Sequence, residues 1–244
     1  MKLINKFMQC LYPPSIYCIM CGSIIDETRK YCLCDSCITR FMWIKNKTCE
    51  KCGKLLEENY TKKLCPDCLK REHYFDKGFT CSQYGLYERS LIVDFKKLGK
   101  SYIGKVLGEI LYDRLVIENL ELDVIISVPI HRKKLKERGY NQAELMALSL
   151  AKKLGVEYDG DVLFRTKKTV PMKRLGPAER IDNLRGAFDI NLSTIDKIRG
   201  KNILIVDDIY TTGATLDECS RILKENYAKK VYILTFAAGN IMVI

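Results

Sequence analysis

Eight cysteines near the N-terminus have a spacing that suits metal binding. They form two units, each reading Cys-x-x-Cys, then twelve residues, then Cys-x-x-Cys, and the second unit lies 31 residues after the first. Two Cys-x-x-Cys pairs together supply the four thiolates of a tetrahedral zinc site, with no coordination position left open. We therefore predict two structural zinc ions, with ligand sets Cys18, Cys21, Cys34 and Cys37, and Cys49, Cys52, Cys65 and Cys68.

Each cysteine unit is too small to fold on its own apolar core. It spans 20 residues from first to last cysteine, so a bound metal must supply much of its folding free energy. Redox-active Cys-x-x-Cys pairs and a crossed pairing of the four pairs are alternatives, and the sequence leaves the crossed order open. Cys10, Cys32, Cys81 and Cys219 fall outside the repeat and are predicted to be free thiols. His73, just after the second unit, is predicted to be a surface residue.

A second segment suited to chemistry is ILIVDDIYTTGAT, residues 203–215. An apolar run ends in Asp207 and Asp208, and a loop of small and hydroxyl residues follows before a predicted helix. Backbone N–H groups of such a loop, threonine hydroxyls and the helix N-terminus can bind a phosphate monoester. The carboxylates can accept hydrogen bonds from ribose hydroxyls or hold a divalent ion through water. A purely structural alternative has Thr215 capping the helix, with Glu218 completing a capping box.

The elements that must position this loop follow from the apolar pattern. Short, wholly apolar runs predict buried parallel strands, and periodic apolar positions predict helices. The predicted strands are 124–128, 203–206 and 231–237, and the predicted helices are 89–98, 101–118, 141–154 with Asn141 as N-cap, and 215–226. This alternation predicts a doubly wound parallel α/β sheet, whose ligands bind beyond the carboxyl ends of the strands.

Charge and composition describe an ordinary globular chain with an anionic partner. The 244 residues carry a formal charge of +11. Residues 1–75 hold 13 Lys/Arg and 8 Asp/Glu, and residues 76–244 hold 28 and 22. Because eight zinc-bound thiolates would nearly neutralise the first part, the basic charge belongs mainly to the second. We expect a zinc-binding unit at 1–75 and an α/β domain at 76–244.

The length of the apolar runs bears on whether the protein enters a membrane. None approaches the ~20 residues of a membrane-spanning helix, and the N-terminus lacks the features of a signal peptide. We therefore expect a cytoplasmic protein without membrane insertion.

Residues 203–215 closely resemble the ribose-phosphate signature of the type I phosphoribosyltransferases, which bind 5-phosphoribosyl-1-pyrophosphate (PRPP) with Mg²⁺. The resemblance implies that Asp207 and Asp208 are catalytic residues that contact the ribose. It assigns the 5′-phosphate to the loop Thr211, Thr212, Gly213, Ala214 and Thr215.

Two further segments, VPIHRKKLKERGYNQ at 128–142 and RTKKTVPMKRLGPAERIDNLRGAF at 165–188, resemble the ComF family of competence proteins. The match covers nearly the whole chain and implies a role in DNA uptake and natural transformation. Pyrophosphate contacts are then expected from Pro129, His131, Arg132 and Arg138. The chain departs from the pattern at Thr211, where many phosphoribosyltransferases have Asp, and at Met172 and Arg174.

The leading hypothesis is thus a Mg²⁺-dependent phosphoribosyltransferase whose acceptor is unknown. One alternative is a PRPP or nucleotide sensor without turnover. Another is an adaptor that binds single-stranded DNA or the DNA-uptake machinery.

Overall fold

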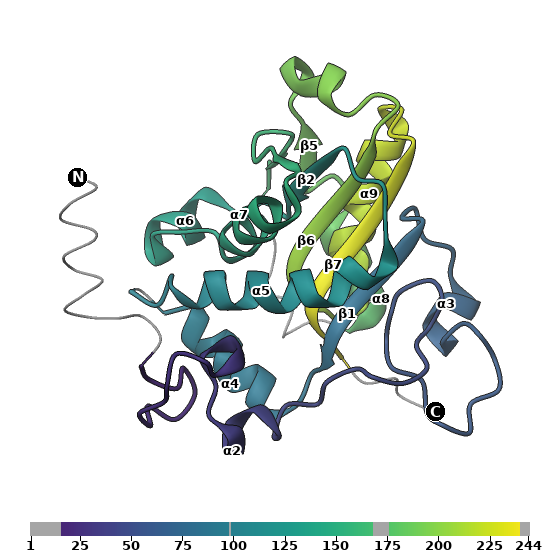
Figure 1. Cartoon of the computed structure of the whole chain (residues 1–244). Helices are drawn as coiled ribbons and strands as arrows, with labels where there is room; N and C mark the ends of the chain where they lie inside the picture. The colour runs from purple at the N-terminus through teal and green to yellow at the C-terminus, as the bar shows by residue number, and fades with distance from the viewer. Residues whose placement is uncertain (1–15, 98, 168–175, 240–244) are drawn as a thin grey trace.

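The computed structural model describes residues 16–97, 99–167 and 176–239. Its centre is a five-stranded sheet with the order β1-β7-β6-β2-β3, in which all paired neighbours are parallel. Helices cover both faces (Figure 1), so the predicted doubly wound parallel α/β fold is confirmed. The strands are β1 (Lys77–Gln83), β2 (Val124–Ser127), β3 (Glu157–Tyr158), β6 (Asn202–Tyr210) and β7 (Lys230–Ala238).

The two faces of the sheet form two separate hydrophobic clusters. In β6, Ile203 and Ile205 point into one cluster, and Leu204 and Val206 point into the other. This alternation is the period of two that every strand imposes on its side chains. The first cluster contains α9 (Ala214–Glu225), and the second contains α4 (Leu86–Phe95), α5 (Ile103–Leu115) and α7 (Gln142–Leu154).

The helix ends follow local chemistry. Asn141 caps α7, as predicted, by accepting a 3.2 Å hydrogen bond from the Ala143 N–H. Gly155 ends the same helix with a φ of 69°, a conformation that glycine adopts at little cost. The described residues after Lys77 also form η2 (Val116–Glu118), α6 (Arg132–Arg138), α8 (Pro177–Leu184) and η4 (Leu192–Lys197).

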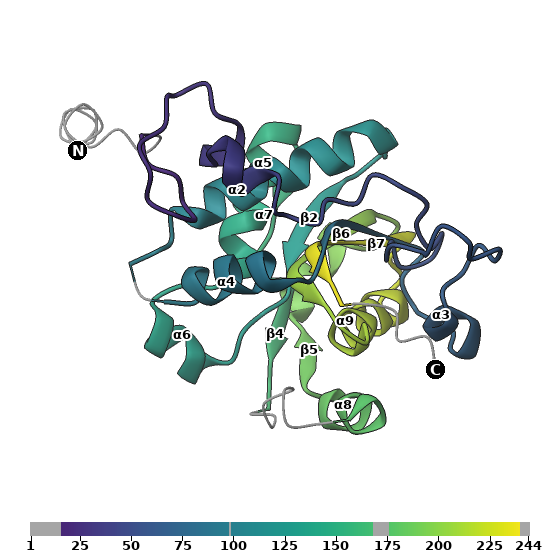
Figure 2. The same ribbon diagram turned by 90° about the horizontal axis from the view of Figure 1, so that it is seen from below.

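A small antiparallel pair, β4 (Leu163–Arg165) and β5 (Phe188–Ile190), projects from the main sheet (Figure 2). No clear apolar pattern predicts this pair, since each strand has only three residues. The pair matters because it brings Arg165 toward the carboxyl edge of the sheet.

The two cysteine units pack against opposite faces of the sheet. Ribbon 1 (residues 16–40) contains η1 (Lys30–Cys32) and α2 (Asp35–Ile38), and its buried cysteines join the cluster under α4 and α5. Ribbon 2 (residues 47–70) contains α3 (Pro66–Lys70), and its four cysteines join the cluster under α9. The linker between them pairs with β1 through an antiparallel bridge between Trp43 and Ser82. Both ribbons therefore share the hydrophobic cores of the α/β sheet.

Within the part of the chain that the structure describes, every helix is too short or too polar to cross a lipid bilayer.

Candidate functional site

The eight repeat cysteines gather into two groups of four. In each group the sulfur atoms lie within 4.8 Å of one another, and the grouping follows the uncrossed order. Gly22 and Gly53 both have a φ of 74° just after the second cysteine of their units. The backbone N–H of Cys65 donates to the Cys49 sulfur at 3.2 Å, as is usual for a metal-bound thiolate. Four converging sulfurs per group form a donor set that fits structural zinc.

Among the described residues, the three other cysteines take no part in these groups. Cys81 and Cys219 are buried, and burial raises the pKa of the Cys81 thiol to about 12 and that of Cys219 further, so neither is a reactive thiolate. Cys32 is not among the clustered sulfurs, and Cys10 lies outside the described residues.

The prediction for His73 was wrong. Its side chain is buried, stacks on Phe75 with ring centroids 4.8 Å apart, and lies 3.3 Å from an Asp217 carboxylate oxygen. The segment that leaves ribbon 2 passes under α9, and sequence spacing does not reveal that contact.

We predict that the protein purified without added metal contains two zinc ions per chain. The reason is that both groups bring four sulfurs together in one geometry. Elemental analysis by mass spectrometry, normalised to protein concentration, measures the ratio. One zinc per chain, or iron in place of zinc, would contradict the assignment.

The acid pair lies within β6, whose predicted C-terminal end fell four residues too early. β6 continues to Tyr210, and Asp207 is paired in register with Thr235 of β7. The Asp208 N–H donates to the Asp207 carboxylate at 2.8 Å. The strand extends because β7 runs equally far and supplies hydrogen-bond partners for these residues.

Burial, followed by the neighbouring Asp208 carboxylate, raises the pKa of Asp207 to about 7. The negative charge of Asp208, by contrast, has a direct partner, because the Lys96 ammonium lies 2.6 Å from its carboxylate. Lys96 is the residue that ends α4. Sequence reasoning missed it, since a lysine at a helix end is common and nothing local places that end beside β6.

Several cations surround the acid pair. Burial lowers the pKa of Lys134, and the positive charges of three neighbours lower it further. Those neighbours are Arg138, Arg165 and Lys96. Lys96 and Arg165 in turn lower the pKa of Asp207. Residues from α4, α6 and β4 thus converge at the carboxyl edge, where a polyanion would be neutralised.

The Arg-Gly-Tyr-Asn-Gln run holds α6 in this position. Gly139 ends α6 with a φ of 80°, and the Tyr140 hydroxyl lies 2.7 Å from the Phe95 carbonyl and 2.8 Å from that of Lys97. The Asn141 amide donates to the Val128 carbonyl at 3.0 Å, and Arg138 donates to the Gln142 side chain at 2.7 Å. The run therefore joins the end of β2, the end of α4 and the basic helix α6.

The other residues predicted to contact pyrophosphate differ in exposure and in local role. Pro129 follows β2 and is half-buried. The His131 ring caps α6, since its Nδ1 accepts from the Lys133 N–H at 3.2 Å. Arg132 is exposed on the first turn of α6. Met172 and Arg174 lie outside the described residues.

The predicted phosphate loop leads directly into α9. Thr211 is exposed, Thr212 and Thr215 are half-buried, and Gly213 and Ala214 are buried. Gly213 is the N-cap with a φ of 76°, and an added Cβ there would lie 2.3 Å from the Tyr210 hydroxyl. No side chain caps α9, so its first N–H groups have no intrahelical or side-chain acceptor.

The capping box of Thr215 and Glu218, the structural alternative to a phosphate loop, does not form. The helix begins one residue earlier than expected, at Ala214, which places Thr215 inside the first turn. Glu218 instead accepts from the Gly186 N–H at 2.9 Å and pairs with Arg221. The helix terminus can therefore serve a ligand. The acid pair, the uncapped start of α9 and several cations lie together at one edge of the sheet.

We predict that Asp207→Asn raises the melting temperature of the unliganded protein more at about pH 8 than at about pH 5. An unfolded aspartate ionises near pH 3.9 and Asp207 near pH 7, so the stability that its protonated form contributes is lost as pH rises between them. Asparagine removes the charge that causes this loss.

Thermal denaturation at both pH values measures the effect, with Asp196→Asn at an exposed position as the matched control. An equal change at both pH values would contradict a raised pKa at Asp207.

Comparison with known proteins identifies two family models in the chain. Residues 7–69 match the double zinc ribbon domain, and residues 135–242 match the phosphoribosyl transferase domain. The allosteric regulatory enzyme of purine biosynthesis is a similar solved structure, with 21% identity and a TM-score of 0.38 over 57% of this chain and 26% of that one.

Curated relatives carry competence and DNA names. The chain is 33% identical to DNA utilization protein YhgH of Escherichia coli O157:H7, over 52% of this chain and 55% of that protein. It is 30% identical to Competence protein F of Haemophilus influenzae over 169 residues, which are 67% of this chain and 73% of that protein. With a double zinc ribbon before a phosphoribosyltransferase domain, the chain belongs to the Competence protein F family.

Proposed function

We propose that this protein binds PRPP as its magnesium complex at the carboxyl edge of the sheet and transfers the phosphoribosyl group. The observation that carries the proposal is the position of the acid pair of β6. It lies between the uncapped start of α9 and the cations of α4, α6 and β4. Each part of PRPP then has a chemically matched partner.

The ribose hydroxyls would donate to Asp207 and Asp208, and the 5′-phosphate would accept from the loop and first turn of α9. The pyrophosphate would lie toward Lys134, Arg138 and Arg165. In this arrangement Lys96 no longer pairs with Asp208. The ribose hydroxyls donate to Asp208, and Lys96 pairs with a phosphate of PRPP.

The acid pair also fits a hydrated Mg²⁺. Magnesium prefers carboxylate oxygens, keeps several waters and bridges to substrate phosphates. A nearby divalent cation would lower the raised pKa of Asp207, which favours binding of the metal complex over the free anion. When bound, the ion would neutralise charge that develops on the departing pyrophosphate.

The residue at position 211 bears on the acceptor. Transfer breaks the bond from C1′ to pyrophosphate oxygen and forms a bond from C1′ to the acceptor, which must give up a proton. Thr211 supplies no carboxylate to take that proton. An acceptor that is already anionic at neutral pH is therefore favoured. The same observation also supports the alternative of a PRPP sensor without turnover.

We predict that PRPP with Mg²⁺ raises the melting temperature of the wild-type protein, because a ligand specific for the folded state stabilises it. Asp208→Asn should abolish this rise, since it removes a carboxylate that accepts from the ribose hydroxyls. Thr212→Val should reduce the rise less, because it removes one donor among several. Thermal denaturation with PRPP and, as a control, ribose 5-phosphate measures both effects. An unchanged melting temperature of the wild-type protein at saturating PRPP would refute the site.

A second candidate function, single-stranded DNA binding, is favoured by a groove between ribbon 1 and α5. The groove has a volume of about 790 Å³, and its lining includes Tyr31, Phe41 and Trp43 beside Lys45 and Arg114. Phe41 is only 4% exposed and stacks with Trp43 at a centroid distance of 5.2 Å, so the half-buried rings of Tyr31 and Trp43 are the ones that a base could contact. Aromatic rings beside cations are the usual platform for unpaired bases. The names of the two relatives, which refer to competence and DNA utilization, agree with this role.

We predict that a short oligothymidylate changes the fluorescence of Trp43, the only tryptophan of the chain. Affinity should fall with salt, with a log–log slope of about −0.7 per phosphate contacted. Saturating PRPP should leave the affinity unchanged, because neither the acid pair nor the cations near it line the groove. Binding that PRPP abolishes, without a tryptophan signal, would instead assign the DNA to the cations at the carboxyl edge.

A further inference from the structure

Asp217 joins the phosphate-binding helix to the segment that leaves ribbon 2. The Tyr74 N–H donates to one carboxylate oxygen at 2.8 Å, and the Arg71 guanidinium pairs with the other. The Asp217 side chain is only 2% exposed, and His73 lies on its inner side at 3.3 Å. A buried carboxylate with a charged partner and a backbone donor is a strong and geometrically specific contact.

The position of Asp217 in α9 makes this contact relevant to the phosphate loop. Its own N–H donates to the Gly213 carbonyl at 2.8 Å, which closes the first turn of the helix. The contact therefore fixes the turn whose preceding N–H groups face the proposed phosphate. Thr215, on the same turn, is left half-exposed for a ligand.

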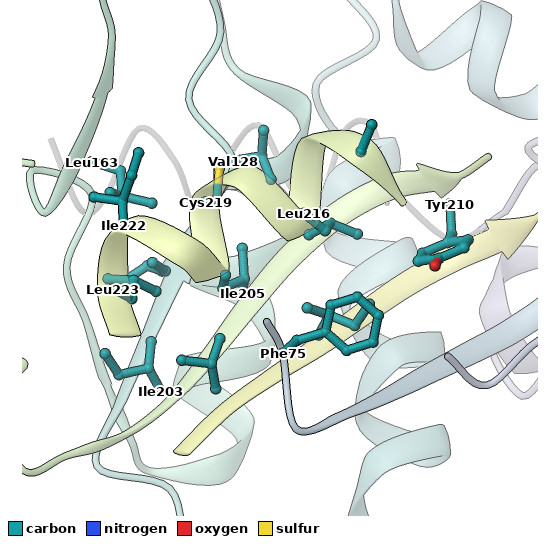
Figure 3. Packing of buried hydrophobic residues seen from close by; sticks show 14 of the residues in the cluster. Phe75, Val128, Leu163, Ile203, Ile205, Tyr210, Leu216, Cys219, Ile222 and Leu223 are labelled. Atoms are coloured by element: carbon teal, nitrogen blue, oxygen red, sulfur yellow. The ribbon is translucent and has the colours of Figure 1, made fainter. Parts of the chain in front are cut away.

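Ribbon 2 also supports the loop through packing. Tyr210, the last residue of β6, is buried with its ring edge-on to Phe75 at 6.4 Å (Figure 3). Lys54 of ribbon 2 is 3% exposed, lies 5.3 Å from the Tyr210 ring centroid and pairs with Asp67 at 2.8 Å. Since an added Cβ at Gly213 would meet Tyr210, the path of the loop depends on where ribbon 2 holds this ring.

Ribbon 1 is attached elsewhere. Its Tyr31 hydroxyl donates to Asp113 of α5 at 2.8 Å, and Lys30 pairs with the same carboxylate. Asp113 lies on the opposite face of the sheet from α9. The two ribbons thus share one cysteine spacing but contact different parts of the domain.

We propose that ribbon 2 positions the phosphate-binding start of α9 through Asp217, so that the zinc content of ribbon 2 sets the affinity for PRPP. Asp217 is a positioning residue, because it acts through the backbone of α9 and faces away from the ligand side. The inference rests on the proposed PRPP site for its effect on affinity, but the coupling itself can be measured without PRPP.

The first experiment compares Asp217→Ala, Asp217→Asn and the matched control Asp113→Ala, which removes the ribbon 1 contact. Calorimetric titration with magnesium PRPP should show affinity about 10-fold lower or more for Asp217→Ala, the loss expected for a buried charged hydrogen bond. Asp217→Asn keeps an acceptor for the Tyr74 N–H and should recover part of the loss. The control should bind as the wild type does.

Amide hydrogen exchange of the unliganded proteins provides the independent readout. Residues 215–220 should exchange faster in Asp217→Ala than in the wild type, while β7 remains protected. Cys49→Ser should lose one zinc and speed up exchange in the same residues, whereas Cys18→Ser should lose one zinc without this effect. The Asp217 variants decide the matter if a cysteine variant fails to fold.

The outcomes separate the two ideas. Unchanged exchange at 215–220 in both Asp217→Ala and Cys49→Ser would overturn the coupling, whatever PRPP does. Faster exchange in a protein whose wild type does not bind PRPP would keep the coupling and refute the proposed function. Faster exchange with unchanged PRPP affinity would overturn the positioning role of Asp217.

Discussion

A parallel sheet has to be covered by apolar side chains on both faces, and this constraint governs where the helices and ribbons of the chain lie. β6 and β7 are buried on both sides, with alternate residues in two separate clusters. Three helices cover one face. On the other face α9 is joined by Phe75 and the four cysteines of ribbon 2. Metal-binding residues therefore complete a hydrophobic core.

The same sheet places charged residues at its carboxyl edge. Their burial there costs stability, although their charges would serve a ligand. β6 continues past its apolar run and carries Asp207 and Asp208 inside a paired strand. The Lys96 ammonium pairs with the carboxylate of Asp208, while the pKa of Asp207 stays raised. A partly buried carboxylate without its own cation destabilises the unliganded protein. Such departures from the rules of a stable fold are expected at binding sites, where a ligand supplies the missing charge.

The sequence was most informative where a local pattern and a local requirement coincide. Continuous apolar runs predicted β2, β6 and β7, because parallel central strands must be apolar on both faces. The Asn141 cap and the cysteine repeat were readable because capping and metal binding need fixed residue types at fixed spacing. β1, which mixes polar and apolar residues, gave no such signal.

The contacts that sequence reasoning missed all join distant segments. Lys96 meets Asp208, and Arg71 and His73 meet Asp217. Each of these residues is ordinary in its own neighbourhood, since a lysine often ends a helix and an aspartate often occupies a first turn. Their importance arises from the crossing of segments more than one hundred residues apart. Only the packing of the sheet determines that crossing.

The repeat of 31 residues illustrates why identical spacing does not imply identical roles. All four cysteines of ribbon 2 are buried, whereas Cys21 of ribbon 1 is exposed and Cys34 is half-buried. Zinc coordination fixes the internal geometry of both units equally, but the surroundings differ because each ribbon meets a different face of one sheet. When a metal site is embedded in a close-packed core, loss of the metal also disturbs the packing of the neighbouring elements. Of the two units, ribbon 2 is the one whose neighbours include the start of α9. For this reason we assign the proposed positioning of the phosphate loop to the zinc of ribbon 2 and not to that of ribbon 1.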